Sequence, residues 1–327
     1  MIRLTALDAL DPLAFLASLG CLAAISERLR GTGRTAPRLG FELDSAAFVA
    51  RLEGIDDEDE LLDLLIADLD GLAGREAEPR DPFLDFSYPG KKDKEGEEVQ
   101  DLKPPPDHFR ALAQGWLDEA RPDSRRTVDW ASAVLTDVAV DNNEASKPFA
   151  LHFTAGNQRF LTIAAELLDG KGKTPGVGRE DLRAAVFGPW PNDRPLKVFS
   201  WSPTQDRPYA LRGLDPASDK KLGTPGADWL ALRGLVLLSS APVGQRIMTG
   251  GVHGNWKTAS FSYPVWERGL EVDAVRSLLR HPAVQAEPTA NEGTLPRGVE
   301  ILTCRISRSD QGGYGAFSRP TRRQLKP

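Results

Sequence analysis

The residue types best suited to binding chemistry lie in residues 154–168. This segment is a small polar loop followed by residues with the apolar spacing of a helix. Gly156 allows a partner to approach the main chain, and Asn157 is a type that caps helices and leaves their first amides pointing outward. Gln158 and Arg159 would project from the positive end of the helix dipole. This predicts contact with a phosphate or a base edge. The alternative is an ordinary helix cap with two solvated side chains.

A second candidate segment, residues 249–257, combines Gly250 and Gly251 with Asn255, Trp256 and Lys257. The glycines would let a nucleic-acid backbone approach, and the amide could read base edges. The indole could stack or wedge, and the lysine could neutralise a phosphate. The alternative is a glycine-rich hairpin with a half-buried tryptophan.

The third candidate is the basic end of the chain, where residues 311–317 interleave glycines with Tyr314 and Phe317. This texture suits contact with a nucleic-acid backbone, or a flexible end. The arginines that we expect to contact the backbone are Arg305, Arg308, Arg319, Arg322 and Arg323.

Signatures of other chemistry are missing from the sequence. There is no Gly-x-Ser-x-Gly elbow and no Gly-x-x-x-x-Gly-Lys-Ser/Thr loop, and the two cysteines and four histidines lack ligand spacing. We therefore expect no catalytic residue, no metal and no cofactor. One rival hypothesis is an enzyme whose Asp, Glu and His residues are gathered by the fold, around His152 or His253. Another is a protein–protein adaptor that docks through an acidic helix over 56–70 and a loop over 90–106.

Composition limits the class of protein. The chain has 327 residues, of which 40% are hydrophobic and 27% charged, with a net charge of -6, so it is not a free-standing basic DNA binder. Residues 42–70 are acidic and residues 297–327 basic, which suggests different neighbours on different sides, or two solvated faces. Cys21 is expected in the core. Asp8 and Asp11 interrupt any signal peptide, and no apolar run reads as long enough to span a membrane, so we expect a cytoplasmic protein.

The elements that must position these residues are predicted from periodicity and caps. Asp11 and Pro12 begin a helix that Gly31 and Gly33 end, and Ser45 caps another helix. Further helices are predicted over 56–72, 108–120, 226–238 and 272–279. Strands are predicted over 38–43, 134–140, 197–203, 259–266 and 299–306.

The fold class follows from the irregular order of these elements. We predict an α+β protein of helices and short antiparallel strands, built as one domain or as two subdomains. A helix-rich subdomain would cover 1–150, with a long charged mobile loop over 76–107, and an α+β subdomain with the basic tail would cover 151–327.

Three segments resemble a known family. Residues 11–22 (DPLAFLASLGCL) are similar to the "PLAFLAALGLL" start of small, large-subunit-type CRISPR-associated proteins of type I-U (also called I-G) effector complexes. Residues 227–235 (ADWLALRGL) resemble their "EWLAxxGL" element, and residues 261–267 (FSYPVWE) resemble their "WPLW" element.

The resemblance implies a non-enzymatic subunit of an RNA-guided surveillance complex. Its partners would be guide RNA, target DNA, backbone subunits and a helicase–nuclease. It would read the motif beside the target and aid R-loop formation, while guide pairing reads the sequence. Large subunits of this class are often bigger and end in a helical bundle, whereas this chain ends in a basic strand and tail, which leaves open whether it also holds the displaced strand.

Overall fold

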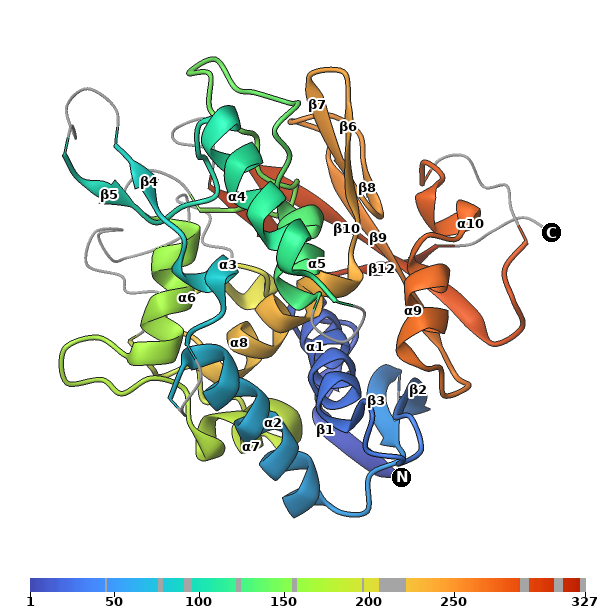
Figure 1. The fold of residues 1–327 in the computed structure, drawn as a ribbon. Coiled ribbons are helices and arrows are strands. Elements are labelled where there is room, and N and C mark those ends of the chain that lie inside the picture. The colour runs from blue at the N-terminus through green and yellow to red at the C-terminus, as the bar shows by residue number, and fades with distance from the viewer. Residues whose placement is uncertain are drawn as a thin grey trace, which may run out of the picture.

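The computed structural model describes residues 1–44, 46–75, 79–90, 96–121, 125–154, 158–195, 197–205, 222–288, 294–308 and 314–323. Within these ranges the chain mixes helices with short antiparallel strands, which confirms the predicted α+β class (Figure 1).

The first helix, α1 (Pro12–Leu29), lies near the centre of the molecule (Figure 1). Asp11 caps it as predicted, because its Oδ1 accepts the N–H of Leu13 at 2.9 Å. Every α1 residue from Pro12 to Ile25 is buried, including Cys21. The expectation that no apolar run could span a membrane is wrong by length and composition, since α1 is long and apolar enough. It is 83% buried, however, as the core helix of a soluble-type fold is.

Helix α8 (Pro225–Gly234) crosses α1 at backbone contact, and η4 (Leu235–Leu237), a 3-10 turn, continues it. A Cβ on Gly20 would lie 1.8 Å from the carbonyl oxygen of Leu230, and a Cβ on Gly234 would lie 2.3 Å from that of Leu16. Side chains at these two positions would force the helices apart.

The N-terminal sheet is antiparallel, in the order β1 (Ile2–Asp8), β3 (Ala47–Glu53), β2 (Arg38–Asp44). The helix predicted after Ser45 is wrong, because β3 occupies that position and pairs with both neighbours. Ser45 itself lies outside the described residues.

The second sheet is built on the long strand β10 (Val299–Arg308). One edge of β10 pairs with β9 (Ser260–Trp266), which in turn pairs with β8 (Val252–His253). The other edge takes two segments from the end of the chain, β11 (Gly315–Phe317) and β12 (Thr321–Arg323). Much of the basic tail is therefore part of a sheet and not a flexible end.

The remaining elements surround this frame. The helices are α2 (Glu58–Ala73), α3 (Pro82–Asp85), α4 (Pro106–Glu119), α5 (Arg126–Val134), α6 (Phe160–Asp169), α7 (Arg179–Phe187), α9 (Val272–Leu279) and α10 (Pro282–Gln285), with the 3-10 turn η2 (Pro203–Gln205). The strands are β4 (Tyr88–Pro89), β5 (Glu98–Val99), β6 (Ser240–Val243) and β7 (Arg246–Thr249), which form two hairpins.

Three sequence predictions fail here. The described part of 76–107 holds α3 and the β4–β5 hairpin rather than one bare loop, with residues 76–78 and 91–95 outside the description. The strand predicted over 134–140 is the end of α5 followed by one isolated bridge between Val140 and Ser146. The described part of 197–203 forms no ladder.

The three segments that carry the family resemblance meet in the core. Phe15 of α1 stacks on Tyr263 of β9 with ring centroids 4.3 Å apart, and α8 packs on α1. The Tyr263 hydroxyl donates to the carbonyl oxygen of Ala9 at 2.7 Å. One hydrophobic cluster contains residues from both sides of position 150. The resemblance therefore lies in residues that build the fold.

Candidate nucleic-acid interface

The loop before α6 is only partly described, since Gly156 and Asn157 lie outside the described residues. Helix α6 begins at Phe160 with Arg159 as its N-cap residue, so Asn157 is not the cap. The Phe160 N–H donates to Oδ1 of Asp101 at 2.9 Å, and this carboxylate occupies one of the amides predicted to hold a phosphate. Gln158 and Arg159 are half-buried, and their contact with nucleic acid stays a prediction.

Asp101 also lies 3.5 Å from Nε2 of His152, the histidine around which the enzyme hypothesis was framed. The same Nε2 is 3.0 Å from Oγ1 of Thr154. Burial lowers the pKa of His152, so its imidazole is neutral at pH 7. His152 is enclosed by the fold here, and neither it nor His253 lines the cleft between α1, α5 and α9.

Gly250 and Gly251 serve the packing of β8 against its neighbours. The Gly250 N–H donates to the carbonyl oxygen of Ser239 at 2.8 Å. Gly251 has a φ of +76°, and a Cβ there would lie 2.2 Å from the carbonyl oxygen of Ser262. The protein backbone beside Gly251 explains the small size of that residue, and the contact of both glycines with a ligand stays a prediction.

Asn255 stabilises a tight turn between β8 and β9. Its Oδ1 accepts the N–H groups of Lys257 at 3.1 Å and of Thr258 at 3.3 Å, so this oxygen is not available to read a base edge. The turn displays Trp256, whose surface is 55% exposed, and Lys257, which is also exposed.

The Arg308 guanidinium packs against the Trp256 ring. Its guanidinium lies 4.4 Å from the centroid of the Trp256 ring and 5.2 Å from that of Phe153. It donates to the carbonyl oxygens of Ala150 at 2.5 Å and His152 at 3.3 Å. Burial lowers the pKa of Arg308 to about 10. The Arg308 guanidinium therefore holds an exposed indole in place, and its contact with a nucleic-acid backbone stays a prediction.

Two further tail arginines are also committed to the protein. Arg323 donates to the carbonyl oxygens of Ala283 and Ala286 at 3.1 and 3.0 Å, which ties β12 to α10. Arg322 lies over the ring of Phe48 at 4.6 Å and 3.6 Å from a carboxylate oxygen of Glu300. These contacts explain both residues structurally.

Arg305, Arg319 and Lys257 differ from these, because each is exposed and none has a carboxylate partner among the described residues. The sheet register brings the backbones of Arg305 and residue 318 to the end of the sheet at which the 255–258 turn lies. Ser260 lies opposite Arg305, and the Ser318 N–H donates to the Arg305 carbonyl oxygen at 2.9 Å. We call the surface of Trp256, Lys257, Arg305 and Arg319 the tryptophan surface.

The sequence indicates each residue of this surface as a candidate but does not predict that they lie at the same end of one sheet. Trp256 and Lys257 were assigned to one segment and the arginines to another, because only the pairing of β10 with β9 and with residue 318 unites them. No protein-family model and no curated protein matches this chain.

Proposed function

We propose that this chain is a non-catalytic, nucleic-acid-contacting subunit of a type I CRISPR effector complex, working in the cytoplasm. The observation that carries the proposal is the tryptophan surface: an exposed indole and three exposed cations, which lack carboxylate partners in the described chain, belong to segments that meet at the same end of the second sheet. The segments in α1, α8 and β9 resemble the large-subunit-type family, and this resemblance is our reason for placing such a surface in a type I CRISPR effector complex.

The chemistry of the surface suits an unpaired strand. An exposed indole face can stack on any base, and a tryptophan held by a guanidinium loses little freedom when it binds. Lys257, Arg305 and Arg319 would each take a phosphate. In the assembled complex this contact would hold a strand of the opening duplex near its adjacent motif, while guide pairing reads the sequence.

The first test measures binding of a fluorescent single-stranded oligonucleotide to the purified chain over a series of salt concentrations. Trp256→Ala should weaken binding about tenfold, because stacking on an aromatic side chain contributes about 1–3 kcal/mol per base. Replacing Lys257, Arg305 and Arg319 together by Gln should reduce the salt slope by about two, at about 0.7 per lost phosphate contact.

Matched controls separate this surface from general changes in charge or apolar area. Arg183→Gln removes an exposed arginine that pairs with Asp59, and Leu117→Ala shortens an exposed apolar side chain on α4. Both should bind like the unaltered chain. Equal affinities and salt slopes for all variants would rule out the tryptophan surface as the site.

Membership of the complex needs a separate experiment. The chain should be co-expressed with the products of the adjacent genes and a CRISPR transcript, then purified by a tag on this chain. We expect a particle that contains guide RNA. Recovery as a free monomer without RNA would remove the CRISPR assignment, whatever the oligonucleotide result.

A further inference from the structure

A cleft of about 540 Å³ opens between the end of α1, the start of α5, η4 and the start of α9. Its volume is in the range of small-molecule sites, about 300–1,000 Å³. Six arginines contribute to its lining: Arg30, Arg34, Arg125, Arg126, Arg233 and Arg276.

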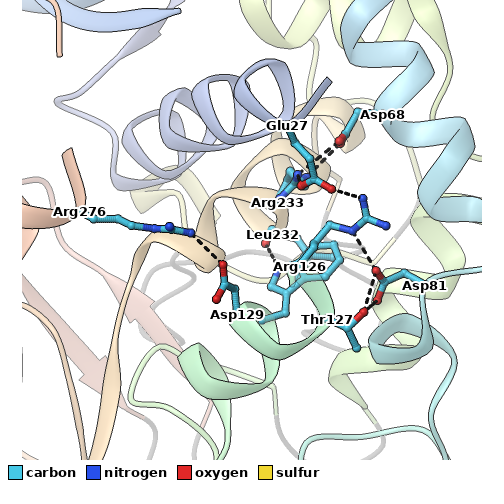
Figure 2. A network of polar contacts seen from close by, with 10 residues as sticks. Glu27, Asp68, Asp81, Arg126, Thr127, Asp129, Leu232, Arg233 and Arg276 are labelled. Atoms are coloured by element: carbon cyan, nitrogen blue, oxygen red, sulfur yellow. Dashed lines mark hydrogen bonds and ion pairs between the residues drawn. The ribbon is translucent and has the colours of Figure 1, made fainter. Parts of the chain in front are cut away.

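The floor of the cleft is a buried ion network (Figure 2). Arg233 of α8 is 1% exposed, and its Nε lies 3.0 Å from Oδ2 of Asp68 on α2. A second contact joins Arg233 to Glu27 of α1. The Arg233 guanidinium also lies 5.5 Å from the ring centroid of Trp130. These contacts satisfy Arg233 and make the floor rigid, so it is a support and not a free ligand group.

The same carboxylates hold the cleft arginines in position. Glu27 also accepts a hydrogen bond from Nη1 of Arg126 at 2.5 Å, and Asp81 accepts one from Nε of the same guanidinium at 2.9 Å (Figure 2). A carboxylate that serves two guanidiniums neutralises neither fully, and it fixes both.

Asp129 of α5 repeats this arrangement on the adjoining wall. Its Oδ1 accepts the Nε–H of Arg125 at 2.9 Å. Its Oδ2 accepts an Nη2–H of Arg276 at 3.0 Å, which joins α5 to α9 (Figure 2). Among the described residues, no hydrogen bond uses the two terminal nitrogens of Arg125 or Nε of Arg276, and Nη1 of Arg276 lies 3.7 Å from Oδ1 of Asp273. A guanidinium has five N–H donors, so donors remain beyond those that hold the side chains.

Two helix N-termini accompany these arginines. Helices α5 and α9 have Arg125 and Glu271 as N-cap residues, and neither cap makes a side-chain hydrogen bond. The carboxylates of Glu271 and Asp273 also line the cleft, but Glu271 pairs with Arg38 at 2.8 Å and the Asp273 side chain is 89% exposed. The Arg38 guanidinium thus neutralises Glu271, and the Asp273 carboxylate is largely solvated.

We propose that this arginine cleft binds phosphate groups of a nucleotide-sized ligand. Planar guanidiniums match phosphate oxygens two at a time, and arginines already fixed by carboxylates need little further ordering to bind. The phosphates belong either to a free nucleotide or to a nucleic-acid strand. The site shares no residue with the tryptophan surface and does not depend on the function proposed for it.

The test is calorimetric titration of the full chain with inorganic triphosphate, at a fixed salt concentration. The unaltered chain should bind saturably. The double variant Arg125→Gln, Arg276→Gln should bind at least about tenfold more weakly, since each charged hydrogen bond contributes about a factor of ten. Arg183→Gln, an ion-paired arginine of α7, should bind like the unaltered chain.

Two competition arms identify the source of the phosphates. Displacement of triphosphate by ATP but not by a short oligonucleotide supports a free nucleotide, and displacement by the oligonucleotide supports a strand. Trp256→Ala should leave triphosphate binding unchanged, so failure here is distinguishable from failure of the tryptophan surface.

Circular dichroism checks that the double variant is folded. If it is not, Arg34→Gln on the opposite wall replaces it, because Arg34 is a surface residue paired with Glu60. Absence of saturable triphosphate binding to the unaltered chain would overturn the proposal. So would equal affinity in a folded cleft variant and in Arg183→Gln.

Discussion

Asp228 is a fully buried carboxyl group with one oxygen that lacks a hydrogen-bond partner among the described residues. It lies in the first turn of α8 with no exposed surface, and its Oδ1 accepts the Phe199 N–H at 3.1 Å. Its Oδ2 has no hydrogen-bond partner in the described chain. Burial raises the pKa of Asp228 to about 7, and the nearby charge of Asp11 adds to this effect. Burial likewise raises the pKa of Asp11 to about 6.

These pKa values predict that the protein loses stability as the pH rises from about 4 to about 7. Both carboxyls hold their protons in the folded chain at a pH where the unfolded chain releases them, so the folded state binds more protons. The contribution is complete below the unfolded pKa and lost above the folded one. For Asp228 the loss is about 4 kcal/mol, at about 1.4 kcal/mol per pH unit.

Asp228→Asn should therefore raise the free energy of unfolding at pH 8 by about 2 kcal/mol and change it little at pH 4, because the amide oxygen can still accept the Phe199 N–H. Urea denaturation at both pH values measures this. Asp193→Asn, at an exposed position, is the matched control. A variant that is less stable than the unaltered chain at pH 8 would show that Asp228 is charged and satisfied.

Among the secondary-structure elements, the α1–α8 crossing is the contact most sensitive to added volume. Gly20 and Gly234 each face a backbone carbonyl of the other helix at less than the contact distance of a Cβ. Gly20→Ala should lower the free energy of unfolding by about 3 kcal/mol, because overpacking a close-packed contact typically costs about 1–3 kcal/mol.

The control for this substitution lies in α4. Gly115 is inside that helix, exposed, and a Cβ there would meet nothing within 4 Å. Gly115→Ala should raise the free energy of unfolding by up to about 1 kcal/mol, through helix propensity alone. Thermal unfolding of the two variants should thus shift in opposite directions. A shift of both in the same direction would contradict close contact between α1 and α8.

The elements that sequence could predict are those with local signals. Asp11 and Pro12 fix the start of α1, and the acids at 57–60 fix that of α2. The helix predicted after Ser45 rests on a cap residue alone, whereas pairing with β1 and β2 makes that stretch the strand β3. The tryptophan surface and the arginine cleft could not be assembled from sequence, since each joins several elements distant along the chain.

At the scale of the whole molecule, the two halves predicted as subdomains contribute to one core. Helix α1 packs on α8, and Trp130 donates from Nε1 to the carbonyl oxygen of Leu232 at 2.9 Å. The buried network joins Glu27 and Asp68 of the first half to Arg233 of the second. A charge left unpaired in such a network costs several kcal/mol, so each half stabilises the other.

A fragment that ends at residue 150 should therefore fail to fold cooperatively. It would expose the apolar face that α1 presents to α8, at about 1.5–3 kcal/mol for each large side chain, and would leave Glu27 and Asp68 without Arg233. Urea denaturation followed by near-ultraviolet circular dichroism should show a single steep transition for the intact chain and a broad, shallow change for the fragment. A steep transition in the fragment alone would instead establish residues 1–150 as an independent subdomain, because a core that needed α8 could not form without it.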